Sequence, residues 1–228
     1  MIPVLAALAC LQLADPVEFS RPLVELLKTP WPKNRTVTVV CHGHSVPAGF
    51  FKTPVVQTFD AYPHLLHQAI KAKFPNAVVN VIVTAIGGEA SESGAARFEK
   101  DVMALHPDVV TIDYALNDRR LGLEKARTSW VSMISAAQKG GAKVILLTPS
   151  WDLTGNVADA NDPLQVHSLQ IRALAAEYKT GLADSFGSFL KAKESGVDMT
   201  TLNSQSNHPN RAGHELILQG LKPWFGLK

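Results

Sequence analysis

The stretch Val39-Val40-Cys41-His42-Gly43-His44-Ser45 decides the fold that we expect, because it joins an apolar run to a polar turn. A continuous run of β-branched and other apolar residues is typical of a parallel strand that is covered on both faces. The polar residues after such a run lie beyond the carboxyl end of the strand. The segment therefore predicts a buried strand over residues 36–41, with Ser45 in the turn that follows.

Similar runs recur along the chain, and helical patterns separate them. The later strands are expected at residues 77–83, 109–114, 143–148 and 181–183, and the helices at residues 61–74, 89–105, 123–139, 163–178 and 212–225. Strands that alternate with helices form parallel sheets through right-handed crossovers. The fold class is therefore α/β, a three-layer α/β/α structure with a doubly wound, five-stranded parallel sheet.

The length of the chain is sufficient for one core. Its 228 residues, of which 46% are hydrophobic, are few for two full domains. We expect a single domain over residues 21–228, preceded at residues 1–20 by a signal peptide or an N-terminal helix. The apolar run at residues 1–11 has signal-peptide length, but no Lys or Arg precedes it. A signal peptide would make the protein secreted or periplasmic; a buried helix would leave it cytoplasmic.

Charge and cysteine content exclude several classes of partner. The formal net charge is +2 and there is no basic block, so we expect no nucleic-acid binding and no stable membrane insertion. The run at residues 1–11 is also too short to span a bilayer. Cys10 and Cys41 are the only cysteines, too few for a disulfide framework or a thiolate metal site. A small-molecule substrate is the expected partner, and the oligomeric state is left open.

Polar residues follow several of the predicted strands. Ser45, Gly88, Asn117 and the turn at residues 148–150 each come just after a strand, and His208 precedes the last helix. The carboxyl ends of parallel strands share one edge of the sheet, where ligands bind in folds of this class. These segments are therefore expected to meet in one crevice.

Together these residues could perform acyl transfer. A serine needs a base to remove its proton, and the acyl intermediate needs hydrogen-bond donors for its oxyanion. Taken singly, Ser45 is more often a turn serine, Gly88 part of a tight turn, Asn117 a helix cap and His208 a solvated histidine. Their order and spacing along the chain make the combination informative.

The sequence resembles the SGNH (GDSL-type) hydrolase family over most of its length. The similar blocks are Gly43-His44-Ser45, Ala85-Ile86-Gly87-Gly88-Glu89, Ala115-Leu116-Asn117-Asp118 and Gln205-Ser206-Asn207-His208-Pro209-Asn210. The resemblance implies a flavodoxin-like fold without a cofactor. It also implies that Ser45 is the nucleophile, Gly88 the backbone oxyanion donor, Asn117 the side-chain donor and His208 the base.

The chain departs from the family pattern at several positions. His44 and Ala115 replace an Asp and a Gly, and Gln205 stands where the family has the Asp that holds the catalytic histidine. A carboxylate partner normally fixes the imidazole tautomer and stabilises the imidazolium. The residue that orients His208 is therefore the open question.

Three interpretations of this departure remain open. First, a backbone carbonyl or Gln205 orients His208, leaving a Ser-His dyad. Second, Asp184 at the end of the last strand is a displaced acid, although it also fits as the cap of a helix starting near Ser185. Third, the site is catalytically inactive.

Some neighbouring residues suggest substrate contacts or a metal. We expect His44, Trp151 and Gln205 to contact substrate. His42 and His44 could form a metal site with His208 or His214, but no His-x-x-x-His or cysteine pair supports one, so no metal is predicted.

The predicted function is that of a serine esterase or acylhydrolase. The expected substrate is a short-chain ester or a carbohydrate O-acetyl ester, since no extended apolar lid is present to receive a long acyl chain. The alternatives are an acyltransferase that uses the same site and a non-catalytic carbohydrate-binding domain on a decayed hydrolase scaffold.

Overall fold

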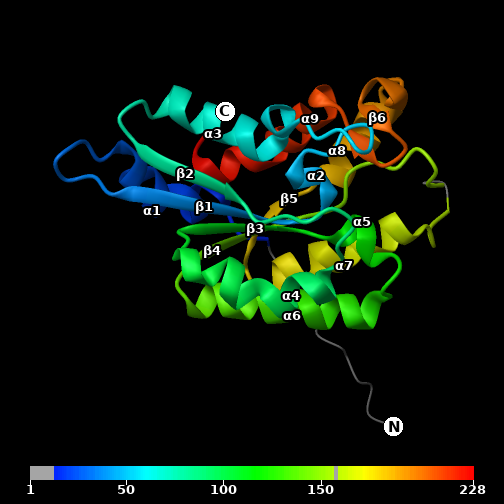
Figure 1. Cartoon of the computed structure of the whole chain (residues 1–228), viewed down its shortest axis with the longest axis horizontal. Coiled ribbons are helices and arrows are strands. Elements are labelled where there is room, and N and C mark those ends of the chain that lie inside the picture. The colour runs from blue at the N-terminus through cyan, green and yellow to red at the C-terminus, as the bar shows by residue number, and fades with distance from the viewer. Residues whose placement is uncertain (1–12, 157–158) are drawn as a thin grey trace, which may run out of the picture.

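The computed structural model describes residues 13–156 and 159–228, and its centre is a five-stranded parallel sheet (Figure 1). The strands are β1 (Thr36–Gly43), β2 (Val78–Val83), β3 (Val109–Asp113), β4 (Lys143–Leu147) and β5 (Gly181–Ala183). Their order is β2-β1-β3-β4-β5, the flavodoxin-like order. The predicted fold class is confirmed.

The connections of β1 determine where a ligand would bind. Strand β1 lies between β2 and β3, with Cys41 opposite both Val83 and Thr111. Because β1 and β3 are neighbours while β2 lies on the far side of β1, the chain reverses its winding direction between β1 and β3. Folds of this class bind ligands at such a switch point, beyond the carboxyl ends of the strands.

Helices cover both faces of the sheet (Figure 1). The α-helices are α1 (Pro16–Lys28), α2 (Ser45–Ala48), α3 (Tyr62–Lys73), α4 (Ser91–Asp101), α5 (Ala115–Asp118), α6 (Leu123–Lys139), α7 (Pro163–Glu177), α8 (Ser185–Glu194) and α9 (Arg211–Leu221). The 3-10 helices are η1 (Thr58–Asp60), η2 (Met103–Leu105), η3 (Met199–Thr201) and η4 (Lys222–Phe225).

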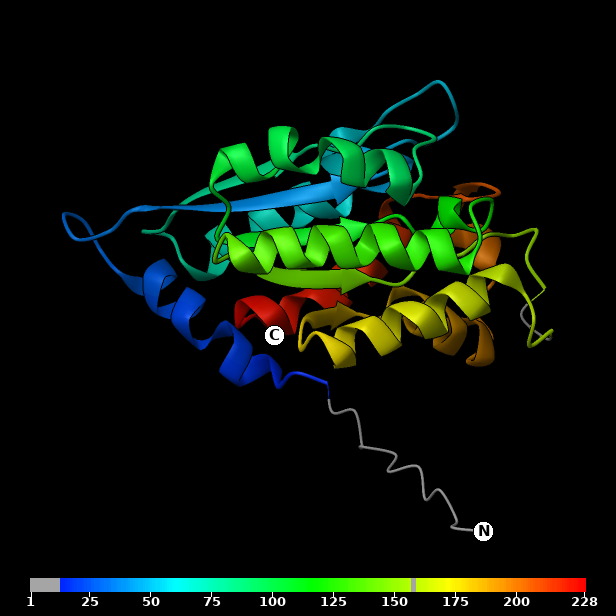
Figure 2. The ribbon, with the colours of Figure 1, turned by 90° about the horizontal axis from the view of Figure 1, so that it is seen from below.

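The two helical layers enclose separate cores. Helices α4, α6 and α7 pack on one face around Trp130, and α1, α3, α8 and α9 pack on the other around Phe189. Figure 2 shows α7 beside α6 and α1 near the C-terminal helix. The one-sided apolar stripes of these helices explain the packing, since each buries a single face against the sheet.

Helix α1 spans the boundary expected at residue 20. It continues through Pro22, and its Leu23 and Leu27 are buried in the core. The boundary expected at residue 20 therefore falls inside a continuous helix. The apolar run at residues 1–11 and Cys10 lie outside the described residues. Within the described ranges, no helix is both long and apolar enough to span a bilayer.

The segment that carries His208 forms a small antiparallel pair of strands. Strands β6 (Asn203–Gln205) and β7 (His208–Pro209) pair just before α9, with Gln205 opposite His208. In Figure 1, β6 lies beyond the strand ends of the main sheet, on the same side as α2 and α5. This pairing gives His208 a fixed backbone position.

Candidate active site

Ser45 is the first residue of α2 and lies just beyond the carboxyl end of β1. The backbone just before Ser45 is tightly packed. A Cβ at Gly43 would lie 2.5 Å from the carbonyl oxygen of Asp113 on the neighbouring strand. A side chain there would push β1 away from β3, so glycine allows the turn to sit where it does. The Ser45 side chain is held in a defined place at the switch point.

His208 makes one hydrogen bond from each ring nitrogen. Its Nε2 lies 3.0 Å from Ser45 Oγ, and its Nδ1 lies 3.0 Å from the backbone carbonyl of Phe51. A carbonyl oxygen can only accept, so Nδ1 carries the proton and Nε2 presents its lone pair to the Ser45 hydroxyl. This is the tautomer that a general base requires.

Two backbone N–H groups hold the loop that presents the Phe51 carbonyl. The Phe51 N–H donates to the Val55 carbonyl over 2.9 Å, and the Thr53 N–H donates to Gln205 Oε1 over 3.0 Å. The Gln205 side chain thus makes no hydrogen bond to His208. It holds the loop whose carbonyl contacts His208, which agrees with the dyad interpretation.

The surroundings of His208 favour its neutral form. Burial lowers the pKa of His208 below its ordinary value of 6.5, the Phe51 carbonyl opposes that shift, and His44 adds to it. Since the neutral ring is the form that accepts a proton, the base is available below the pH at which an exposed histidine would become charged.

His44 lies on the other side of Ser45 and is fully buried. Its Nδ1 accepts the Val46 N–H over 3.2 Å and lies 3.4 Å from Ser45 Oγ. Its Nε2 lies 3.4 Å from Asp113 Oδ1 without hydrogen-bond geometry. The expectation that His44 contacts substrate is wrong in this structure, because a ring without solvent access caps α2 instead.

Gly88 and Asn117 lie with Ser45 and His208 around a pocket of about 400 Å³. The other walls come from Phe50, Thr53, Gly87, Arg119, Arg120 and Asn207. Asn117 Nδ2 donates one hydrogen bond to the Glu89 carbonyl over 2.9 Å, which leaves its second N–H for a ligand. The residues predicted from the four sequence blocks therefore meet in one pocket.

Glu89 joins the two segments that carry Gly88 and Asn117. Its backbone carbonyl binds the Asn117 amide, and its carboxylate accepts hydrogen bonds from Arg97 Nε and the Tyr114 hydroxyl, each over 2.9 Å. Tyr114 directly precedes α5, the short helix that carries Asn117. Glu89 thus fixes the loop of Gly88 relative to Asn117, a role that the sequence analysis missed.

Asp184 does not orient His208, which corrects the prediction of a displaced acid. Its carboxylate pairs with Arg172 over 2.9 Å, accepts the Thr148 hydroxyl over 2.9 Å and caps α8. The capping interpretation of this residue is the one that fits. These contacts occupy the carboxylate, and the Phe51 carbonyl already occupies His208 Nδ1.

Trp151 is buried and does not line the pocket, contrary to the expected substrate contact. Its ring stacks on Phe186 with centroids 5.9 Å apart. An aromatic residue just after a core strand is more often core than ligand wall, and this one follows that rule.

No metal cluster forms among the described residues: no group of at least three His, Cys, Asp or Glu side chains there could hold an ion. His42 binds Thr84 and Tyr114, and burial lowers its pKa to about 4. His214 accepts the Tyr62 N–H, and burial lowers its pKa to about 3. Both histidines are neutral structural groups.

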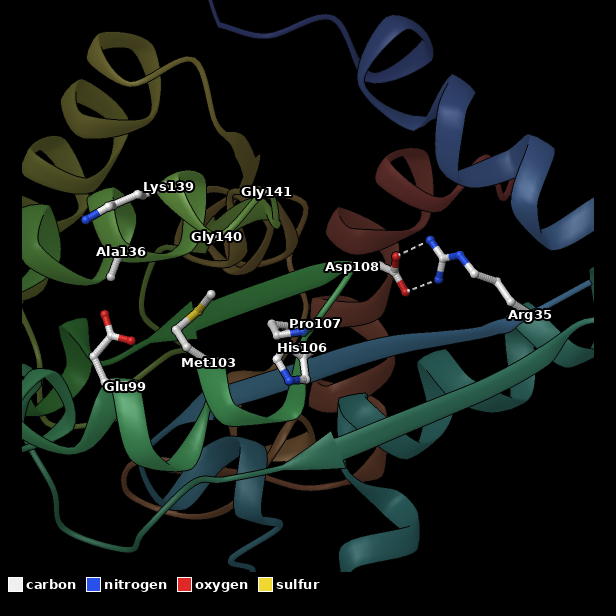
Figure 3. A pocket seen from close by; sticks show the side chains of 10 residues that line it. All are labelled: Arg35, Glu99, Met103, His106, Pro107, Asp108, Ala136, Lys139, Gly140 and Gly141. Carbon is white, nitrogen blue, oxygen red and sulfur yellow. Dashed lines mark hydrogen bonds and ion pairs between the residues drawn. The ribbon is translucent and has the colours of Figure 1, made fainter.

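A second hollow of about 650 Å³ lies at the opposite end of the strands (Figure 3). Arg35 and Asp108 face each other across two hydrogen bonds there, and Asp108 also accepts the Thr38 N–H over 2.9 Å. These contacts tie the start of β1 to the start of β3. The lining contains no serine or cysteine nucleophile, so the chemistry is assigned to the Ser45 pocket.

The fold is a doubly wound α/β sheet, and its pocket brings together Ser45 and His208. Residues 41–216 match the GDSL-like Lipase/Acylhydrolase family, and the chain belongs to that family. It is accordingly a carboxylic ester hydrolase of the SGNH/GDSL type, as the resemblance implied. No curated protein sequence matches the chain.

Solved structures share the fold. Axe2, an acetylxylan esterase from Geobacillus stearothermophilus, is 20% identical, with a TM-score of 0.72 over 84% of this chain and 95% of its own. A two-domain esterase (CEX) active on acetylated mannans is 18% identical, with a TM-score of 0.74 over 92% of this chain and 53% of its own. At these identities the likeness concerns the fold.

Proposed function

We propose that the chain hydrolyses short-chain O-acyl esters of carbohydrates, with Ser45 as nucleophile and His208 as its base. The observation that carries this proposal is the 3.0 Å contact between Ser45 Oγ and His208 Nε2, in a pocket also lined by Gly88 and Asn117. The similarity in fold to esterases named for acetylated xylan and mannan supports the carbohydrate ester.

The reaction follows from the positions of these groups. His208 Nε2 takes the Ser45 proton as Oγ attacks the ester carbonyl, and the Gly88 N–H, the Ser45 N–H and the Asn117 amide stabilise the oxyanion. The proton then passes from His208 to the leaving alcohol, giving an acyl-Ser45. Water, activated in the same way, releases the acid and restores Ser45.

The tautomer of His208 makes a dyad sufficient for these steps. In serine proteases a carboxylate holds the imidazole and stabilises its charge. Here the Phe51 carbonyl holds Nδ1–H in the same direction over 3.0 Å, and as an acceptor dipole it also favours the imidazolium that forms during attack.

The test is hydrolysis of p-nitrophenyl acetate and release of acetate from acetylated xylo-oligosaccharides by wild type and by Ser45→Ala. We expect the variant to lose at least about 1,000-fold in kcat/KM, and we expect Ser45 alone to be labelled by a fluorophosphonate. Unchanged hydrolysis by the variant would refute the proposal. A chain-length series that peaks at long acyl groups would refute the short-chain part.

A further inference from the structure

We propose that the pocket contains an anion-binding subsite centred on Arg120, and that the preferred ester substrates carry a carboxylate near the scissile bond. The inference rests on the proposed function, since the subsite lies in the same pocket as Ser45. It adds a preference for charged substrates that neither the family nor the similar structures specify.

The charges around the pocket are unbalanced. Arg119 and Arg120 both line it, and its lining contains no Asp or Glu. Arg119 forms an ion pair with the buried Asp152, in which Asp152 Oδ2 lies 2.7 Å from Arg119 Nη1. This pair neutralises the charge of Arg119. Arg120 has no acidic partner among residues 13–156 and 159–228; its Nη2 donates only to the Gly88 carbonyl, over 3.3 Å. One guanidinium charge therefore faces the pocket uncompensated.

Arg120 contacts the loop that carries the proposed oxyanion donor. The carbonyl that it contacts belongs to Gly88, the residue that supplies the backbone oxyanion donor in the proposed mechanism. An arginine next to that residue can reach a substrate carboxylate within a few bonds of the ester. A guanidinium binds a carboxylate with two parallel N–H···O bonds, and this geometry gives specificity as well as affinity.

Two amide side chains of the pocket also present donors. Asn207 Oδ1 accepts hydrogen bonds from Gln205 Nε2 and Ser206 Oγ, so the donor end of its amide is left for a ligand. Asn117 likewise keeps one amide hydrogen, as described above. The base His208 is neutral and adds no negative charge. A pocket with many donors and no carboxylate suits an anionic ligand with many acceptor oxygens.

The carboxylate could belong to the alcohol or to the acyl group, so the test compares one pair of esters for each. The first pair is an O-acetylated methyl glucuronoside and the corresponding methyl glucoside. The second is mono-p-nitrophenyl succinate and p-nitrophenyl butyrate. Within each pair the ratio of kcat/KM, anionic to neutral ester, is measured for wild type, Arg120→Gln, Arg120→Lys and Arg127→Gln.

The ratio cancels any general effect of Arg120 on the Gly88 loop. We expect wild type to favour the anionic ester of one pair by about tenfold or more, the size of one charge-assisted contact. Arg120→Gln should abolish this preference, and Arg120→Lys should retain part of it. Arg127→Gln removes an exposed charge that pairs with Glu177 and should behave like wild type. Added salt should reduce the preference.

The outcomes separate the two proposals. If wild type hydrolyses the neutral esters but shows no preference in either pair, the anion subsite is refuted and the esterase proposal stands. A preference that persists in Arg120→Gln also refutes the subsite. If wild type hydrolyses none of the esters and acetate release is absent, both proposals fail.

Discussion

Ser45 lies between two imidazoles, and the two sides of it are built differently. On one side, His208 comes from a short strand, opens onto the pocket and is oriented by the backbone carbonyl of Phe51. On the other side, His44 adjoins β1, is fully buried and faces the carboxylate of Asp113. His44, with Asp113 beside it, looks more like part of a catalytic triad. It is nevertheless less suitable than His208 as the base.

The two histidines differ in whether a ring nitrogen has a free lone pair for Ser45 and in whether the ring has access to the pocket. His44 Nδ1 already accepts the Val46 N–H, so its lone pair is occupied where Ser45 Oγ approaches to 3.4 Å. A buried ring also cannot hand a proton to a leaving group in the pocket. His208 Nε2 has a free lone pair at 3.0 Å and lines the pocket. A carboxylate near a histidine therefore does not by itself identify the base.

Replacing each histidine by asparagine should give the largest contrast. For His208→Asn we expect kcat/KM on p-nitrophenyl acetate to fall by about 1,000-fold or more, because no base remains. His44→Asn should stay within about tenfold of wild type, since asparagine still accepts the Val46 N–H as a helix cap. Circular dichroism checks folding. An equal loss in both variants would mean that the two sides share the proton transfer.

The carboxylate on the His44 side should matter for stability more than for rate. Asp113 is buried and accepts the Tyr62 hydroxyl over 3.3 Å, besides its contact with His44. In Asp113→Asn an amide N–H replaces an acceptor there, so we expect the free energy of unfolding to fall by about 2 kcal/mol. Urea denaturation measures the change.

The matched control is Asp184→Asn, which also converts a carboxylate to an amide. Asp184 is partly exposed, and asparagine keeps an oxygen for the Thr148 hydroxyl and for the α8 cap, so loss of the ion pair with Arg172 should cost less than about 1 kcal/mol. If Asp113→Asn instead lowered kcat as far as His208→Asn while leaving stability intact, His44 and Asp113 would belong to the catalytic machinery.

The sequence predicted most of the His208 side of the site and little of the His44 side. Apolar runs located all five strands of the sheet, and the runs of β3 and β4 are apolar because these strands are covered on both faces. The order of the motifs then placed Ser45, Gly88, Asn117 and His208 at one edge. Those residues meet in the structure because parallel strands end together.

The group that orients His208 could not be found in this way. Every residue has a backbone carbonyl, so the carbonyl of Phe51 leaves no trace in the sequence; only the loop conformation aims it. Asp184 has a carboxylate at the expected chain position, but Arg172 and the α8 cap take it up. Asp113 lies within the strand predicted at residues 109–114, and a charged residue in an otherwise apolar strand was the available signal for the carboxylate beside His44.

Replacing Gln205 should lower the rate, although its side chain makes no hydrogen bond to Ser45 or His208. Its Oε1 holds the Thr53 N–H and thereby the loop of Phe51. In Gln205→Ala the loop loses this bond and His208 is oriented less well, so we expect kcat to fall by about tenfold with KM nearly unchanged. Gln205→Glu keeps an acceptor oxygen and should recover most of the rate at neutral pH.

Wild-type kcat in Gln205→Ala would show that the Phe51 carbonyl is held without this residue. Equal loss in Gln205→Glu and Gln205→Ala would show that the acceptor oxygen is not what matters. Either result would leave His208 as the base. It would also mean that the hydrogen bond from Thr53 to Gln205 does not control the orientation of His208.

The smallest expected effect is on the pH profile, and it separates a carbonyl from a carboxylate as the partner of His208. Burial lowers the pKa of His208 from its ordinary 6.5. Protonation removes the lone pair of Nε2, so kcat/KM should be constant at neutral pH and fall only as the pH drops through this lowered value. In Gln205→Glu a nearby negative charge stabilises the imidazolium, and the acid limb should move to higher pH. A wild-type limb above 6.5 would mean that a carboxylate reaches His208 in solution. In that case the contrast between the two sides of Ser45 would disappear, because both imidazoles would then have an acid for a partner.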